Sequence, residues 1–186
     1  WIVLDMMADV HIRQPDQEEG EWLARRPALL PPSTEEYAIA LAASLAAYLL
    51  RHERMVGILA YGSRRLLLPP HRGEGQLERL LEGLALLRAY GEVPFHQVLQ
   101  SHALRMARGS ILILITPSGD PRWAMAARSL DSHGIRVAAM VLEAASFGGP
   151  EISSRVLPLL KSAGIPVAVI RAGEPFASAL ERLGSP

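Results

Sequence analysis

The first nine residues place two carboxylates directly after an apolar run. Asp5 ends the run 1–4, and Met6 and Met7 separate it from Asp9. An apolar run that ends in a carboxylate is typical of a buried central strand, and open α/β folds place their sites where such strands end. A carboxylate at that position offers its oxygen atoms to loop amides or to a bound group. We therefore expect the function of the chain at the edge of the sheet where Asp5 emerges.

A second set of oxygen-bearing side chains follows the most hydrophobic stretch of the chain, 110–116. Thr116, Ser118 and Asp120 lie in the turn that leaves this predicted central strand. Asp120 and Pro121 are typical of an N-cap and of the first residue of a helix. The plainest interpretation is therefore structural, with Asp5 accepting hydrogen bonds from loop amides and Asp120 capping a helix.

Other catalytic signatures are missing from the sequence. The chain has no cysteine, which removes disulfides, thiol nucleophiles and thiolate metal sites. Lys161 is the only lysine and no Walker A motif surrounds it, while Gly73 and Gly75 lack the third glycine of a dinucleotide fingerprint. There is no Gly-x-Ser-x-Gly motif, and the 6 histidines have no paired spacing typical of a zinc site. We expect no enzymatic activity from this chain.

Composition limits the class of protein and its partners. With 186 residues, of which 49% are hydrophobic, the chain predicts one well-cored domain over 1–186. The formal net charge is +0 and the 19 basic residues are scattered, so no nucleic-acid partner is expected. No apolar stretch reaches the length of a membrane span. Because Trp1 already lies in a predicted strand, we expect the chain to be a fragment of a longer protein.

Strands and helices alternate along most of the chain. We predict strands at 1–5, 55–61, 64–68, 110–116, 135–142 and 166–171, and helices at 33–51, 77–87, 94–107, 120–132, 155–163 and 176–183. Residues 33–36 have the form of a capping box, and a long loop of open role covers 10–32. Gly62 and Ser63 predict a two-residue hairpin, and Pro69 and Pro70 should stop the following antiparallel strand at the edge of the sheet. The pattern predicts a doubly wound, mostly parallel six-stranded α/β sheet with one antiparallel edge strand, a Rossmann-like arrangement.

The order of these features resembles that of the von Willebrand factor A domain. The features that carry this likeness are Asp5 at the end of the first strand, the hairpin at 62–63 and the segment 116–120. More narrowly, residues 33–47, 56–62 and 68–81 resemble the C-terminal part of the bacterial domain of unknown function 58 proteins. That resemblance implies a transmembrane anchor upstream of this chain, a position on the cytoplasmic face of the membrane and a MoxR-type AAA+ ATPase as partner.

The von Willebrand resemblance also implies a metal-ion-dependent adhesion site, from which this chain departs. Such a site binds Mg²⁺ through an Asp-x-Ser-x-Ser loop, a Thr from a middle loop and an Asp after the fourth strand. Asp5 matches the first position, but Met7 and Asp9 replace the two serines, and the middle loop 90–95 contains no Thr. A thioether is a poor ligand for Mg²⁺. A remodelled or vestigial site would use Asp5, Asp9 and Asp120, and Mg²⁺ is the only cofactor that the resemblance suggests.

Two hypotheses follow, and they belong to different classes. The first is a non-catalytic interaction module with a degenerate metal site, which presents its loops to a protein partner. Its candidate contact residues are Met6, Met7, Tyr90, Thr116 and Ser118. The second is a Mg²⁺- or Mn²⁺-dependent hydrolase or ligand-binding domain that uses the three carboxylates. Dependence on a divalent cation would distinguish the second hypothesis from the first.

Overall fold

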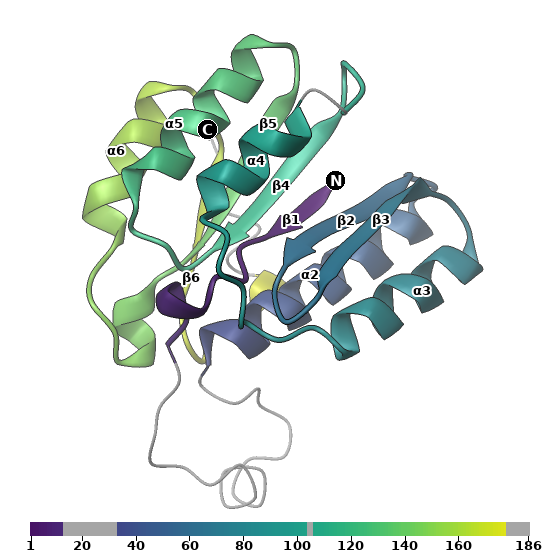
Figure 1. Ribbon diagram of the computed structural model, residues 1–186, viewed down its shortest axis with the longest axis horizontal. Coiled ribbons are helices and arrows are strands. Elements are labelled where there is room, and N and C mark those ends of the chain that lie inside the picture. The colour runs from purple at the N-terminus through teal and green to yellow at the C-terminus, as the bar shows by residue number, and fades with distance from the viewer. Residues whose placement is uncertain (13–32, 104–105, 178–186) are drawn as a thin grey trace, which may run out of the picture.

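The computed structural model describes residues 1–12, 33–103 and 106–177. A six-stranded sheet runs through the molecule in the order β3-β2-β1-β4-β5-β6 (Figure 1). The strands are β1 (Ile2–Leu4), β2 (Val56–Tyr61), β3 (Arg65–His71), β4 (Ile111–Thr116), β5 (Arg136–Leu142) and β6 (Val167–Ile170). β3 is antiparallel to β2, and all other neighbours are parallel. The predicted doubly wound sheet with one antiparallel edge strand is confirmed.

The shortest strand occupies the centre of the sheet. β1 pairs with β2 on one side and with β4 on the other, with Val3 beside both Leu59 and Leu114. All three of its residues are buried, as a strand covered on both faces requires. The sequence Ile-Val-Leu meets that requirement because β-branched and leucine side chains pack well on a pleated surface. β1 therefore delivers Asp5 to the middle of the sheet edge.

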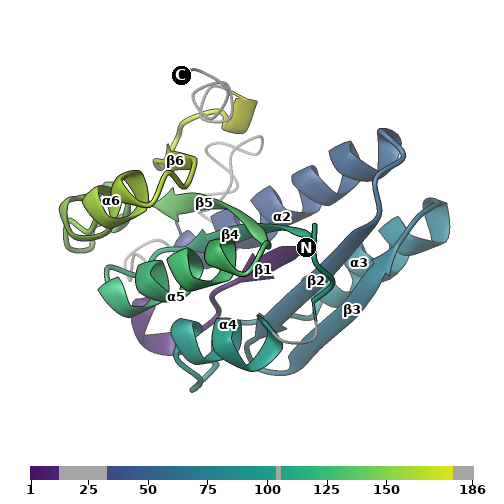
Figure 2. The same ribbon diagram turned by 90° about the horizontal axis from the view of Figure 1, so that it is seen from above.

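Helices cover both faces of the sheet, as the view from above shows (Figure 2). The helices are α2 (Thr34–Arg51), α3 (Glu74–Ala85), α4 (Phe95–Ala103), α5 (Pro121–Ser132) and α6 (Ser153–Ser162), with 3-10 turns η1 (Ala8–Val10) and η2 (Ala144–Phe147). α2 and α3 pack on one face, where they form an apolar core with Ile2, Ile58 and Leu66. α4, α5 and α6 form a second core on the opposite face.

The β2–β3 hairpin differs from the prediction in two ways. Tyr61 pairs with Arg65, so three residues connect the strands instead of the two expected. β3 also continues through Pro69 and Pro70 to His71 instead of ending at Leu68. An edge strand can include proline because the amides on its outer side have no strand to bond. The prolines therefore mark the edge of the sheet without ending the strand.

The predicted capping box at the start of α2 is not formed. Ser33 is the N-cap residue, but its side chain makes no capping hydrogen bond. The buried Glu35 carboxylate instead accepts a hydrogen bond from the backbone N–H of Ala89, at 3.1 Å. Glu35, at the start of the helix, therefore holds the distant Ala89 segment in place. The capping-box pattern was correct only about where the helix begins.

The remaining boundaries differ from the predictions by a few residues. α3 begins at Glu74 instead of 77, α6 begins at Ser153 instead of 155, and α6 carries Pro158 beyond its first turn. The predicted C-terminal helix at 176–183 falls largely outside the described residues, as does most of the loop 10–32. The flanks of that loop are well defined, because the backbone N–H and C=O groups of Ile12 bond the Thr34 hydroxyl and N–H.

Candidate functional site

Asp5 emerges where the winding of the sheet changes direction. The chain proceeds from β1 outward to β2 and β3, then returns to β4 on the other side of β1. Open α/β sheets have a crevice at this point, outside the carboxyl ends of the strands. The Asp5 N–H still donates to the Ile115 carbonyl at 2.9 Å, so the residue continues the ladder between β1 and β4. Its side chain is only 2% exposed.

Both carboxylate oxygens of Asp5 already have partners within the chain. The Thr116 hydroxyl donates to Oδ2 at 2.7 Å, and the Met7 N–H donates to Oδ1 at 3.3 Å. The Thr116 oxygen in turn accepts a hydrogen bond from the Ser118 N–H at 2.9 Å. Burial raises the pKa of Asp5 from 3.8 to about 6, although the bonds from Thr116 and Met7 oppose the rise. Asp5 thus ties the first loop to the loop after β4.

Asp120 is neutralised by a cation two residues further along the chain. Its side chain accepts from the Arg122 N–H at 2.9 Å, which confirms the predicted N-cap of α5. The Arg122 guanidinium folds back and bonds the same carboxylate, with Nε 2.8 Å and NH2 2.7 Å from Oδ2. Hydrogen bonds from Arg122 hold the pKa of Asp120 below its usual range. The positive charge that this carboxylate requires therefore comes from the chain itself.

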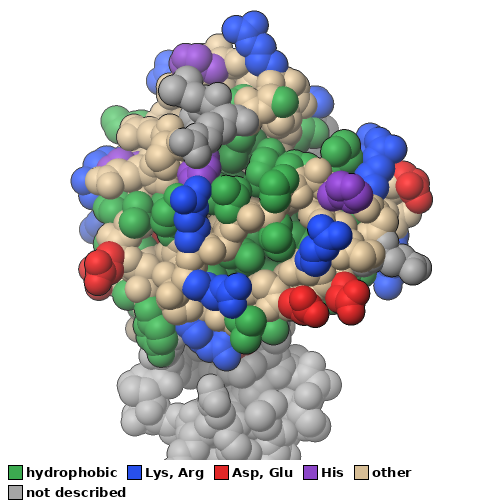
Figure 3. All heavy atoms as spheres, turned by 45° about the vertical axis from the view of Figure 1, so that its right-hand side comes forward, with side chains coloured by type: hydrophobic (Ala, Val, Ile, Leu, Met, Phe, Trp, Pro, Cys, Tyr) green, Lys and Arg blue, Asp and Glu red, His purple; other side chains and the backbone are tan. Residues whose placement is uncertain are grey.

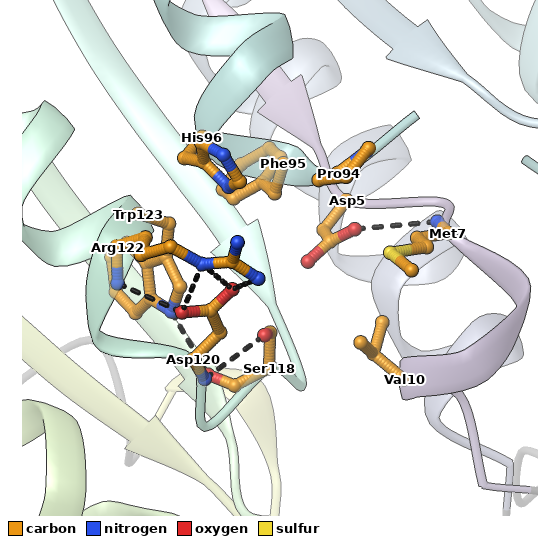
Figure 4. A pocket seen from close by; sticks show the side chains of 10 residues that line it. All are labelled: Asp5, Met7, Val10, Pro94, Phe95, His96, Ser118, Asp120, Arg122 and Trp123. Atoms are coloured by element: carbon orange, nitrogen blue, oxygen red, sulfur yellow. Dashed lines mark hydrogen bonds and ion pairs between the residues drawn. The ribbon is translucent and has the colours of Figure 1, made fainter. Parts of the chain in front are cut away.

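A cavity of about 90 Å³ lies between these two carboxylates (Figure 4). Met7 and Val10 face it from one side, while Asp120, Arg122 and His96 face it from the other, with Asp5 between them. The cavity is lined by Asp5, Met7, Val10, Pro94, Phe95, His96, Ser118, Asp120, Arg122 and Trp123. It is therefore a small hollow with a mixed polar and apolar lining, in which both carboxylates already have hydrogen-bond donors.

The three predicted carboxylates differ in their position relative to the cavity. Asp5 and Asp120 both line the cavity, but Asp9 lies exposed in η1 and does not. Among residues 1–12, 33–103 and 106–177, no group of three or more His, Cys, Asp or Glu side chains could hold a metal ion. Mg²⁺ prefers six oxygen ligands. Asp5 accepts hydrogen bonds from Thr116 and Met7, and Asp120 pairs with Arg122. The three predicted carboxylates are thus not assembled into one site.

The predicted contact residues differ in exposure. Met6 is 1% exposed and belongs to the core beneath α2, so it does not present a surface. Thr116 and Ser118 are also buried and serve the hydrogen bonds to Asp5 and within the loop. Met7 is partly exposed at the cavity, and Tyr90 is 59% exposed. Of the five, only Met7 and Tyr90 offer substantial side-chain surface at this edge.

Backbone contacts hold the first loop and the α3–α4 connection together. The Gly91 N–H donates to the Met6 carbonyl and the Ala8 N–H donates to the Gly91 carbonyl, each at 2.9 Å. A Cβ on Gly91 would collide with the Tyr61 carbonyl, so only glycine allows this close approach. On the other side of the loop, His11 Nε2 bonds the Asp5 carbonyl at 2.7 Å. The first loop is therefore held on both sides.

Arg122 and His96 are the site residues that sequence reasoning missed. Arg122 lies in the first turn of α5, where a cation is disfavoured by the helix dipole unless a carboxylate compensates it. That misplaced charge, directly after an aspartate N-cap, was the available signal. His96 lies in α4, and nothing in its sequence surroundings distinguishes it from the other histidines.

Comparison with solved structures identifies the type of fold. The chain is similar to the conserved hypothetical protein BatB from Bacteroides thetaiotaomicron, with a TM-score of 0.60 and 13% identity over 98% of this chain and 93% of that one. It is also similar to two structures of proximal thread matrix protein 1 from the mussel byssus, with TM-scores of 0.57 and 0.55 at 16% and 14% identity. One of those structures has a zinc-occupied MIDAS motif.

These matches extend over nearly the whole of this chain but not of every neighbour. In both comparisons with the mussel protein, the match covers 98% of this chain and 45% of that one. No protein-family model and no curated protein matches the sequence. At such low identity the likeness concerns the fold alone, and it supports the resemblance drawn from the sequence: the chain has a doubly wound α/β fold of the von Willebrand A type.

Proposed function

We propose that the domain is a non-catalytic protein-interaction module that binds its partner at the carboxyl edge of the sheet without a bridging metal ion. The observation that carries this proposal is the engagement of Asp5. Its two oxygens accept hydrogen bonds from Thr116 and Met7, and Arg122 neutralises Asp120. The adhesion site is degenerate in this sense, because its carboxylates serve the internal structure of the loops.

Side chains around the cavity supply the contact surface. Met7 offers an adaptable thioether next to the cavity, and the Arg122 side chain is 63% exposed while it remains bonded to Asp120. Tyr90 adds a large, mostly exposed aromatic ring from the neighbouring α3–α4 connection. Rigid loops that display such side chains suit recognition of a protein surface.

The wider setting of this module is also part of the proposal. The segments that resemble domain of unknown function 58 proteins support a role as the soluble part of a bacterial membrane-anchored protein, on the cytoplasmic face of the membrane. A MoxR-type AAA+ ATPase is the partner expected from that resemblance. Within the described residues, no helix combines the length and apolar character needed to cross a membrane.

Calorimetry tests the metal-free part of this proposal. We expect no saturable heat when Mg²⁺ or Mn²⁺ is titrated into EDTA-treated protein, and no difference between the wild type and Asp5→Ala. Saturable binding that Asp5→Ala abolishes would overturn the proposal and favour a metal-dependent hydrolase or ligand-binding domain.

Photo-cross-linking tests the interaction itself. A photoreactive amino acid replaces Met7 in the full-length protein, and the matched control replaces Arg136, an exposed residue at the opposite end of β5. Cross-linking in cells and in EDTA-treated extracts should yield a discrete adduct from position 7 and none from position 136. Failure to obtain an adduct from position 7, or an equal yield from both positions, would contradict an interaction at this edge.

A further inference from the structure

The segment between α3 and α4 displays its side chains in strict alternation. Leu86, Arg88 and Tyr90 are exposed, whereas Leu87 and Ala89 are buried. Leu86 is 61% exposed and Tyr90 is 59% exposed, which is a high exposure for large apolar and aromatic side chains. The segment therefore presents a row of one leucine, one arginine and one tyrosine along the same edge as the cavity.

The backbone N–H groups of this row donate hydrogen bonds inside the domain. The N–H groups of Leu87, Tyr90 and Gly91 donate to backbone carbonyls. Those of Arg88 and Ala89 donate to the Ser63 hydroxyl and the Glu35 carboxylate. A partner strand cannot pair with amides that are already bonded. Recognition here must use the side chains, which the bonded backbone holds in a fixed arrangement.

The β2–β3 hairpin brings two more arginines beside this row. The Ser63 N–H donates to the Arg88 carbonyl at 2.8 Å, so the turn that precedes Arg64 and Arg65 contacts the row at Arg88. Arg64 and Arg65 are exposed, and the Arg65 guanidinium carbon lies 5.4 Å from the centre of the Tyr61 ring. We call the five residues Leu86, Arg88, Tyr90, Arg64 and Arg65 the arginine row.

Among residues 1–12, 33–103 and 106–177, no carboxylate forms an ion pair with these arginines. In the part of the chain that the structure describes, Arg64, Arg65 and Arg88 form no ion pair, although Arg88 donates to the carbonyls of Ala85 and Leu87 at the end of α3. The exposed Glu92 continues the segment but forms no ion pair with them. Figure 3 turns the β2–β3 side toward the viewer and shows an apolar area surrounded by Lys and Arg side chains, with Asp, Glu and His side chains further out.

We propose that the arginine row binds an acidic segment of the partner protein, in which carboxylates meet Arg64, Arg65 and Arg88 while apolar side chains cover Leu86 and Tyr90. This inference rests on the proposed function and names the chemistry of its partner. Arginine pairs with carboxylates in bidentate fashion, which gives specificity as well as affinity. The two exposed apolar side chains would lose contact with water in the complex.

An acidic protein segment fits this surface better than a nucleic acid does. A phosphate backbone requires a longer basic track, whereas the arginine row contributes three arginines and the chain has a formal net charge of +0. Leu86 also offers no contact to a phosphate. Binding of an oligonucleotide is therefore an outcome that would contradict the proposal.

Fluorescence anisotropy with a labelled peptide tests the proposal on the whole chain. The probe is a short peptide in which aspartate and glutamate alternate with leucine, and its control carries asparagine and glutamine in place of the acids. We expect saturable binding of the acidic peptide alone, weakened by added salt. Arg64→Glu combined with Arg65→Glu should weaken it at least about ten-fold, or about 1.4 kcal/mol. Leu86→Ser should weaken peptide binding less than this double variant does, and it should leave the salt dependence of binding unchanged.

Matched variants keep the result interpretable. Arg136→Glu reverses one charge at the opposite end of the sheet, as each of the two substitutions does singly, and should leave binding within about two-fold, a difference of less than about 0.5 kcal/mol. Unfolding temperatures of all variants show whether each is folded. Absence of saturable acidic-peptide binding, equal loss in Arg136→Glu, or tighter binding of a single-stranded oligonucleotide would overturn the proposal. An adduct from position 7 without peptide binding would leave the interaction module in place and reject only the arginine row.

Discussion

At the scale of single residues, the site contains a carboxyl group that is buried at an energetic cost. Asp5 is only 2% exposed, and no cation contacts it among the described residues. Two hydrogen bonds offset part of the cost of removing this group from water, yet its pKa remains raised to about 6. Buried carboxyl groups with a raised pKa are often found at functional sites, where function is retained at some loss of stability.

The raised pKa of Asp5 predicts how stability depends on pH. Well below pH 3.8, Asp5 is protonated in both the folded and the unfolded chain. The contribution of neutral Asp5 to the free energy of unfolding is then fully present. As pH rises toward 6, the unfolded chain ionises first and this contribution, about 3 kcal/mol, is lost. Asp5→Asn cannot ionise, so its free energy of unfolding should fall less between these pH values than that of the wild type.

Urea denaturation at a series of pH values measures this difference. Asp9→Asn is the matched control, because Asp9 is an exposed carboxylate in the same loop. It should keep the pH dependence of the wild type. If Asp5→Asn also kept that dependence, another group would be responsible for the titration.

Sequence reasoning located the two carboxylates that line the cavity but not the cation beside them. Asp5 and Asp120 could be placed because each follows an apolar strand, and strand ends meet at one edge of a parallel sheet. Arg122 could not be assigned, because whether its guanidinium turns outward or folds back over Asp120 depends on the shape of the cavity. Likewise, the burial of Met6 follows from the α2 helix above it, which local sequence does not reveal.

At the scale of elements, the start of α2 shows how a local pattern can mislead. Residues 33–36 have the sequence of a capping box, but Glu35 binds the Ala89 N–H and thereby holds the α3–α4 connection against α2. Helix propensity and capping act within a few residues, whereas this bond joins positions 54 apart. Such a contact depends on the tertiary fold and cannot be read from a sequence window.

The Glu35 contact predicts a clear difference between two neighbouring glutamates. Glu35→Ala leaves the buried Ala89 N–H without its acceptor and should lower the free energy of unfolding by about 1–3 kcal/mol. Glu36→Ala removes the carboxylate that a capping box would have used and should cost less than about 1 kcal/mol. Chemical denaturation of both variants compares them directly. A larger loss in Glu36→Ala would mean that the capping box, and not the contact with Ala89, stabilises this region.

At the scale of the whole molecule, the sheet separates two apolar cores. Ile58 faces the core beneath α2 and α3, whereas Ile165 belongs to the core beneath α5 and α6. The alternation of strands and helices was sufficient to predict this three-layer arrangement, because each helix must bury one face against the sheet. Exact boundaries and the course of β3 were not predictable, because edge position decides how proline is tolerated.

The separation of the cores predicts when mutational effects add. Ile58→Val and Ile165→Val should each lower the free energy of unfolding by about 0.5–1.5 kcal/mol, and the double variant should show their sum within about 0.5 kcal/mol. Ile2 is the matched partner, since it lies beside Ile58 in the sheet and shares its core. Ile2→Val combined with Ile58→Val should deviate from the sum. Strong coupling between Ile58 and Ile165 would contradict two independent cores.

The hydrogen bonds between Ile12 and Thr34 mark a place where the number of residues in the chain can change without altering the sheet. They fix Ile12 and Thr34 side by side. Closing a longer loop between fixed ends costs only about 0.6 kcal/mol for each doubling of its length. Evolution could therefore replace or lengthen residues 13–32 at little thermodynamic expense, adding new recognition elements beside an unchanged scaffold.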